Sequence, residues 1–170
     1  MRILVAGVGN VFLGDDGFGV AVARHLAGAG SGDLPGGVEV RDFGIRGVHL
    51  AYELTGGGYD TAILVDAVSR GGPPGTLYVL EPSAGDVPGS FVDAHSMTPE
   101  TVLSLVGVLG GKTGRVLLVG CQPADISPGM GLSAPVADAV GRAADLVVEL
   151  AGQQIAMALA TAGHEEERTC

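Results

Sequence analysis

Hydrophobic and polar positions along the chain follow two periods, and each period predicts a different kind of element. Short apolar runs with almost no polar interruption are typical of strands buried on both faces of a sheet. Longer stretches in which apolar residues recur every three or four positions are typical of helices with one buried face. The pattern predicts strands over residues 2–6, 38–42, 61–65, 76–80 and 115–120, and helices over residues 16–27, 48–54, 99–109 and 134–159.

The alternation of these strands and helices predicts an α/β fold. We expect a three-layer sandwich in which a mainly parallel, twisted sheet of about five strands is flanked by helices. Residues 76–80 alternate between apolar and polar side chains, which favours an edge strand. One domain is expected over residues 1–160, followed by a polar C-terminal tail over residues 161–170, because no linker or internal repeat interrupts the pattern.

Local signals mark the ends of two of the helices. Thr98 is a typical N-cap residue, and the following Pro99 suits the first helical position. The pair Gly110-Gly111 is expected to end that helix. Ser133 is the predicted N-cap of the last helix.

Composition and charge exclude several classes of function. The formal net charge of -10 argues against a nucleic-acid partner, because phosphate binding needs clustered Lys and Arg. No apolar run is long enough to span a bilayer, and the first residues do not resemble a signal peptide. The two cysteines, Cys121 and Cys170, are not expected to form a disulfide. We therefore expect a cytoplasmic protein that contacts neither nucleic acid nor membrane.

The most informative segment is the glycine-rich loop over residues 7–19, between the first strand and the first helix. A loop in this place commonly binds phosphate through its backbone N–H groups. Here two carboxylates, Asp15 and Asp16, stand where the phosphate would lie. Because like charges repel, the loop favours a cation over an anion.

Polar side chains at other strand ends extend this cation site. Ligands of open α/β sheets bind beyond the carboxyl ends of the strands, and Asp66 ends the third predicted strand. His95 lies in the loop before the Thr98 helix. Two carboxylates and one imidazole suit a borderline divalent cation such as nickel or zinc, with positions left for water or substrate. Asp16, Asp66 and His95 are therefore the candidate metal ligands and catalytic residues.

Simpler roles remain open for each of these three residues. Asp16 is also suited to capping the first helix, and Asp66 to holding its turn by a side-chain hydrogen bond. A lone loop histidine such as His95 is often merely solvated. A further functional alternative is that Asp16 and Asp66 form an acid/base pair that activates water without metal.

A nucleotide cofactor is not expected. Gly7 and Gly9 resemble the start of a dinucleotide-binding fingerprint, and Asp42 stands where a ribose-binding acid might. However, Phe12 occupies the position of the third glycine that the fingerprint requires.

Four separated segments resemble, in order, the motifs of the hydrogenase maturation proteases. They are residues 2–19, with the sequence RILVAGVGN followed by GDDGFG, residues 63–67 (ILVDA), residues 93–96 (DAHS) and residues 120–133, which begin GCQP and end GLS. The resemblance extends from Met1 to about Leu150, which is nearly the whole predicted domain.

This resemblance implies an endopeptidase that removes a short C-terminal extension from the large-subunit precursor of a nickel-iron hydrogenase after nickel insertion. The family's nickel-contacting residues correspond to Asp16, Asp66 and His95, and the nickel is expected to arrive with the precursor. The enzyme would be of the aspartic or the metal-dependent type. The family often has Asp-Gly-Gly-Thr after the second strand, where this chain has Asp42-Phe43-Gly44-Ile45. That segment is expected to meet substrate, so the difference leaves the identity of the substrate open.

Two other classes of function remain as alternatives. One is a small nucleotide-binding α/β protein, which would gain thermal stability from a nucleotide. The other is a non-catalytic binding partner of a hydrogenase subunit, which would bind the subunit without changing its mass.

Overall fold

The computed structural model describes residues 1–28, 34–82, 98–111 and 114–167. Their secondary structure, in chain order, is β1 (Ile3–Val8), the 3-10 turn η1 (Gly14–Gly17), α1 (Phe18–Gly28), β2 (Val38–Gly44), α2 (Gly47–Gly56), β3 (Thr61–Ala67), β4 (Leu77–Leu80), α3 (Pro99–Val108), β5 (Arg115–Cys121) and α4 (Ala134–Glu167).

The strands form a single five-stranded sheet in the order β2-β1-β3-β5-β4. The first four strands of that order run parallel, and β4 pairs antiparallel with β5 at the edge, with Leu77 opposite Cys121. The chain passes from β1 to β2 on one side and then returns to β3 on the other. The carboxyl ends of β1 and β3 therefore flank the point where the strand order reverses, which is the usual ligand site of such sheets.

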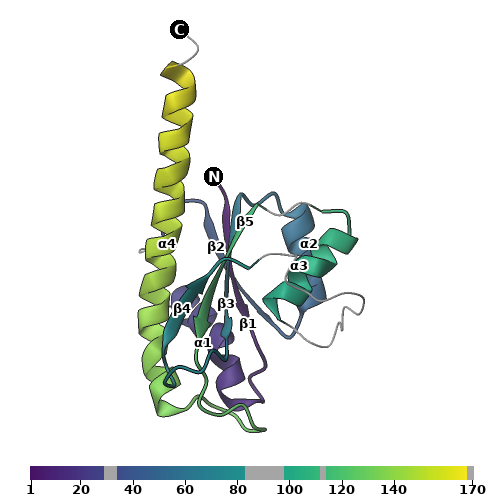
Figure 1. Ribbon diagram of the computed structural model, residues 1–170, viewed down its shortest axis with the longest axis vertical. Helices are drawn as coiled ribbons and strands as arrows, with labels where there is room; N and C mark the ends of the chain where they lie inside the picture. Colours follow the sequence, from purple (N-terminus) through teal and green to yellow (C-terminus); the bar gives the residue numbers. More distant parts are fainter. Residues whose placement is uncertain (29–33, 83–97, 112–113, 168–170) are drawn as a thin grey trace.

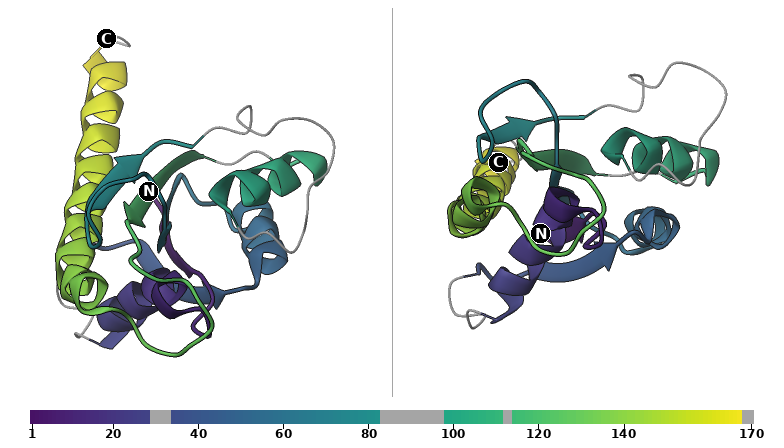
Figure 2. Two further views of the ribbon diagram at one scale, coloured as in Figure 1. Left: turned by 60° about the horizontal axis from the view of Figure 1, so that its bottom comes forward. Right: turned by 90° about the horizontal axis from the view of Figure 1, so that it is seen from below.

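Helices cover both faces of the sheet, so the predicted three-layer α/β sandwich is confirmed. Helices α1 and α4 lie on one face, and α2 and α3 lie on the other (Figures 1 and 2). Successive strand residues point to opposite faces, so Ile3 and Val5 pack with α1 and α4 while Leu4 and Ala6 pack with α2 and α3.

Close backbone packing fixes α1 on the sheet. A Cβ atom at Gly7 would lie 2.3 Å from the carbonyl oxygen of Gly19, and one at Gly19 would lie 2.0 Å from the carbonyl oxygen of Val65. These glycines let α1 approach β1 and β3 more closely than any side chain would allow. The contact sets the position of the turn that carries Asp16.

Helix ends agree with the sequence in one place and differ in another. The hydroxyl of Thr98 accepts a hydrogen bond from the Thr101 N–H at 3.3 Å, with Pro99 in the first helical position, as predicted. The first helix was predicted to begin at Asp16, and this is wrong. Asp16 belongs to η1, and α1 begins at Phe18, because a tight 3-10 turn replaces the first helical residues.

Helix α4 extends past the sheet (Figure 1). Its N-terminal half is core, with Val136, Ala143 and Val147 fully buried, whereas Leu159 is 70% exposed. The helix continues to Glu167, into the segment that the sequence assigns to a polar tail. By length and composition alone, Ala134–Ala162 is long and apolar enough to cross a membrane. This differs from the sequence-based expectation that no segment is long enough to do so. Its buried residues, however, belong to the core against the sheet.

Candidate active site

The connection from β1 to η1 folds back on itself and presents Asp16. The Asn10 N–H donates to Asp16 Oδ2 at 2.8 Å, and the Asn10 side-chain oxygen accepts from the Phe12 N–H at 3.0 Å. The Asp16 carboxylate is thus turned toward the loop and does not cap α1. Gly9 has a φ of +133°, and a Cβ atom there would lie 1.9 Å from the Asp16 carbonyl oxygen. The loop can close in this way only around a glycine.

Asp66 reaches the same place from the end of β3, the central strand. A Cβ atom at Gly9 would lie 3.7 Å from Asp66 Oδ1, so Asp16 and Asp66 both border Gly9. Asp66 is 7% exposed, and its carboxylate accepts a hydrogen bond from the Ala67 N–H at 2.8 Å. Burial raises the pKa of Asp66 well above its ordinary value, and the negative charge of Asp16 raises it further. The structure therefore brings these two predicted site residues together at the switch point of the sheet.

His95, the third predicted residue, lies outside the described residues, in the segment 83–97. That segment precedes α3, whose first turn carries Glu100. The charge of Glu100 also raises the pKa of Asp66, so the start of α3 lies on the side of the molecule that holds the two aspartates. The sequence did not indicate Glu100, because a glutamate in a first helical turn is usually explained by the helix dipole.

Asp15 has a different role from its neighbour Asp16, although the two carboxylates are adjacent in the glycine-rich loop. Its side chain is 1% exposed and accepts four hydrogen bonds: from the N–H groups of Ala124 and Asp125 at 2.8 and 3.0 Å, and from the N–H and hydroxyl of Ser133 at 2.6 and 2.8 Å. Burial alone would raise the pKa of Asp15, but these bonds outweigh it and lower the pKa.

Asp15 therefore anchors η1 to the connection between β5 and α4, with both of its carboxylate oxygens engaged in hydrogen bonds. Ser133 directly precedes α4, as an N-cap residue does, and its hydroxyl donates a hydrogen bond to the Asp15 carboxylate. Sequence reasoning missed this anchor because adjacent residues on a 3-10 turn point in different directions, and the donors are more than 100 residues away.

In the described part of the chain, the candidate metal ligands at this site are the carboxylates of Asp16 and Asp66. Among those residues no group of three or more His, Cys, Asp and Glu side chains has the geometry of a metal site. Asp16 and Asp66 supply oxygen donors, which suit borderline and hard divalent cations. Cys121 is fully buried, and burial together with the charge of Asp15 raises the pKa of its thiol to about 11, so it is unsuited to be a nucleophile.

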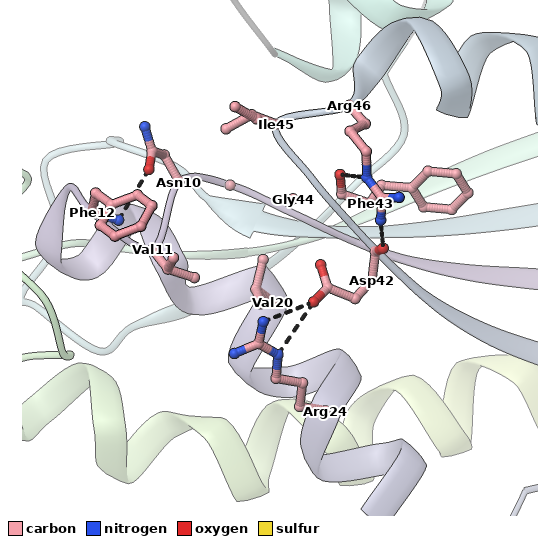
Figure 3. A pocket seen from close by; sticks show the side chains of 11 residues that line it. Asn10, Val11, Phe12, Val20, Arg24, Asp42, Phe43, Gly44, Ile45 and Arg46 are labelled. Atoms are coloured by element: carbon pink, nitrogen blue, oxygen red, sulfur yellow. Dashed lines mark hydrogen bonds and ion pairs between the residues drawn. The ribbon is translucent and has the colours of Figure 1, made fainter.

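A cavity of about 430 Å³ adjoins the loop after β1 (Figure 3). Its wall includes Asn10 and the segment Asp42–Arg46, which comprises the end of β2 and the two residues before α2. The carboxylate of Asp42 pairs with Arg24 of α1, with Nε to Oδ2 at 3.2 Å. Asp42 therefore forms part of the cavity wall and is paired with Arg24, separate from the two carboxylates of Asp16 and Asp66.

The chain is similar to known proteins in both sequence and fold. A family model described as hydrogenase maturation protease matches residues 20–150. The hydrogenase 2 maturation protease of Escherichia coli (strain K12) is 32% identical, over 97% of this chain and 94% of that protein. The hydrogenase expression/formation protein HupD of Rhizobium leguminosarum bv. viciae is 34% identical, over 88% of this chain and 73% of that protein. Among solved structures, the hydrogenase maturating endopeptidase HybD from E. coli superimposes with a TM-score of 0.70, at 28% identity, and covers 91% of this chain and 94% of its own.

The family model covers most of α1, all of β2 to β5 and the first half of α4, and so includes Asp66, whereas Asp16 lies just before its start. Similarity thus extends over most of the chain in both sequence and backbone. The chain belongs to the hydrogenase maturation protease family and is a hydrolase that acts on peptides.

Proposed function

We propose that the protein is a cytoplasmic endopeptidase that removes the C-terminal extension of a nickel-iron hydrogenase large-subunit precursor after nickel insertion, with no nucleotide cofactor. Family membership supports the reaction class, and the similarity to the hydrogenase 2 maturation protease of E. coli supports a hydrogenase as the partner. The observation that carries the proposal is the meeting of Asp16 and Asp66 beside Gly9, at the switch point of the sheet.

In this proposal nickel is part of the substrate and is held by the precursor. The enzyme binds productively only to a precursor that carries the metal. Asp16, Asp66 and His95 complete the coordination of the metal. Burial of Asp66 and, next to it, the negative charge of Asp16 make the Asp66 carboxylate costly to ionise and raise its pKa. A divalent cation offsets that repulsion and lets both carboxylates ionise. Recognition is therefore strong only for a precursor that brings the metal.

Cleavage then requires an activated water molecule and a polarised scissile carbonyl. Nickel bound between precursor and enzyme would act as a Lewis acid on that carbonyl or lower the pKa of a bound water. Alternatively, Asp66 acts as the general base, because a carboxylate with a raised pKa accepts a proton more readily near neutral pH. The first route makes the enzyme metal-dependent, and the second makes it an aspartic-type endopeptidase that uses nickel only for recognition.

Intact mass spectrometry tests this function. The purified protein is incubated with nickel-loaded and nickel-free forms of the same precursor. We expect loss of a C-terminal peptide from the loaded form alone. A stable complex with an unchanged precursor mass would instead indicate a non-catalytic partner, and equal cleavage of both forms would contradict nickel recognition.

A further inference from the structure

The cavity beside the catalytic loop has an apolar interior that the chemistry of Asp16 and Asp66 does not use. We call it the Phe12–Ile45 pocket, after the two side chains at its rim. Its floor includes Val20 of α1 and Phe43 of β2, which are 2% and 7% exposed. Figure 3 shows Phe12 and Ile45 on separate loops, one after β1 and the other before α2.

The rim leaves two large apolar side chains in solvent. Phe12 and Ile45 are each 62% exposed, although both stand next to a cavity of about 430 Å³. Large apolar side chains gathered around a hollow are typical of a surface that another molecule covers.

The charged groups in the wall are already engaged within the protein. Arg24 pairs with the carboxylate of Asp42 at 3.2 Å. Arg46 donates from Nε to the Phe43 carbonyl oxygen at 3.1 Å, and from Nη2 to the Asp42 carbonyl oxygen. A charged ligand group would have to compete with these bonds, whereas an apolar group would fill the pocket without disturbing them.

The pocket shares two loop residues with the surroundings of the carboxylate pair. Gly9 and Asn10 form part of its wall, and the N–H of Asn10 holds the carboxylate of Asp16 at 2.8 Å. Gly9 also borders Asp66. A peptide segment whose scissile bond lies at the two carboxylates therefore has the pocket beside it, with Gly9 and Asn10 between the two.

We propose that the Phe12–Ile45 pocket receives an apolar side chain of the precursor next to the scissile bond and so helps to determine which precursor is cut. This inference rests on the proposed function. It commits to one occupant, an uncharged apolar side chain of the protein substrate, because the wall is mostly apolar and its charged side chains are hydrogen-bonded within the protein.

Steady-state cleavage of the nickel-loaded precursor tests the inference. The pocket variants are Ile45→Asp and Phe12→Asp, whose exposed positions leave the core intact. The matched controls are Val108→Asp and Leu159→Asp, at apolar positions outside the pocket that are 74% and 70% exposed. We expect each pocket variant to lower kcat/KM by about tenfold or more, since an apolar contact is replaced by a buried charge, and each control to stay within about twofold.

A series of Lys substitutions in the precursor identifies the side chain that occupies the pocket. Apolar residues of the precursor on either side of the cut are replaced by Lys, one at a time. We expect one Lys substrate to be cut poorly by the wild-type enzyme and better by Ile45→Asp, because the new carboxylate pairs with the new ammonium group.

The outcomes separate this inference from the proposed function. If the wild-type enzyme does not cut the precursor, the proposed function fails and the inference fails with it. If it does, and the pocket variants match the controls, the inference alone is wrong. Loss of activity with no Lys substrate rescued would also overturn it, since the pocket would then not hold a side chain next to the cut.

Discussion

The carboxylate of Asp15 accepts hydrogen bonds from both the backbone N–H and the hydroxyl of Ser133, at 2.6 and 2.8 Å. This contact joins the turn after the first strand to the start of the last helix, 118 residues later. Asp16, the next residue, borders Gly9 and Asp66. Asp15 is therefore a positioning residue, and the stability of the fold and the placement of Asp16 depend on the same carboxylate.

Replacing Asp15 by Ala is expected to destabilise the fold strongly. The substitution leaves the donors of Ala124, Asp125 and Ser133 without their acceptor in a buried place. We expect a loss of about 3–5 kcal/mol in the free energy of unfolding, measured by urea titration. Asp138→Asn, at an exposed position of α4, is the control and should change stability by less than about 0.5 kcal/mol. Equal stability of the two variants would contradict the anchoring role of Asp15.

Because the pKa of Asp15 is lowered, we expect the free energy of unfolding to depend on pH in the acid range. The folded-state pKa of Asp15 lies below its ordinary value of 3.8, so ionised Asp15 stabilises the fold above that pH. This contribution is lost as the pH falls through the folded-state pKa. Asp15→Asn lacks the titrating group, so its stability should fall less steeply than that of the wild type below about pH 4. Parallel acid-unfolding curves for the two proteins would contradict the lowered pKa.

Asp66 is expected to change stability with pH in the opposite direction to Asp15. Its pKa is raised in the folded state, so its contribution to stability is present below the unfolded-state pKa and is lost as the pH rises through the folded-state value. Asp66→Asn removes the costly buried charge and keeps an oxygen for the Ala67 N–H. We expect the variant to be more stable than the wild type at pH 7, by roughly 0.5–2 kcal/mol, and inactive. A lower melting temperature at pH 7 would contradict this account.

Gly9 is expected to tolerate no side chain. A Cβ atom there would clash with the carbonyl oxygen of Asp16 at 1.9 Å, and the φ of +133° disfavours any other residue. Gly9→Ala should lower both stability and peptide cleavage by displacing Asp16. Gly141→Ala is the matched control, because Gly141 lies within α4 with open space around it, and it should be neutral or slightly stabilising. Full activity of Gly9→Ala would show that the loop can rearrange without affecting the site.

Much of the fold follows from the apolar pattern, because buried parallel strands such as β3 and half-buried helices such as α1 have distinct periods. The place of Asp16 and Asp66 also follows, because both come at the carboxyl ends of strands. Local pattern does not distinguish Asp15 from Asp16, since the difference depends on donors from the connection after β5. It likewise does not reveal that Asp42 pairs with Arg24, a contact between α1 and β2.

The most direct test of the central claim is the intact mass of a nickel-loaded precursor after incubation with the wild-type protein and its site variants. We predict that the wild type and Asp138→Asn remove the C-terminal extension completely, whereas Asp16→Ala, Asp66→Ala and His95→Ala leave the precursor at full length while retaining a cooperative thermal transition. Complete processing by the Asp16→Ala or the Asp66→Ala enzyme would contradict the claim that these two carboxylates act together on the nickel-bearing precursor.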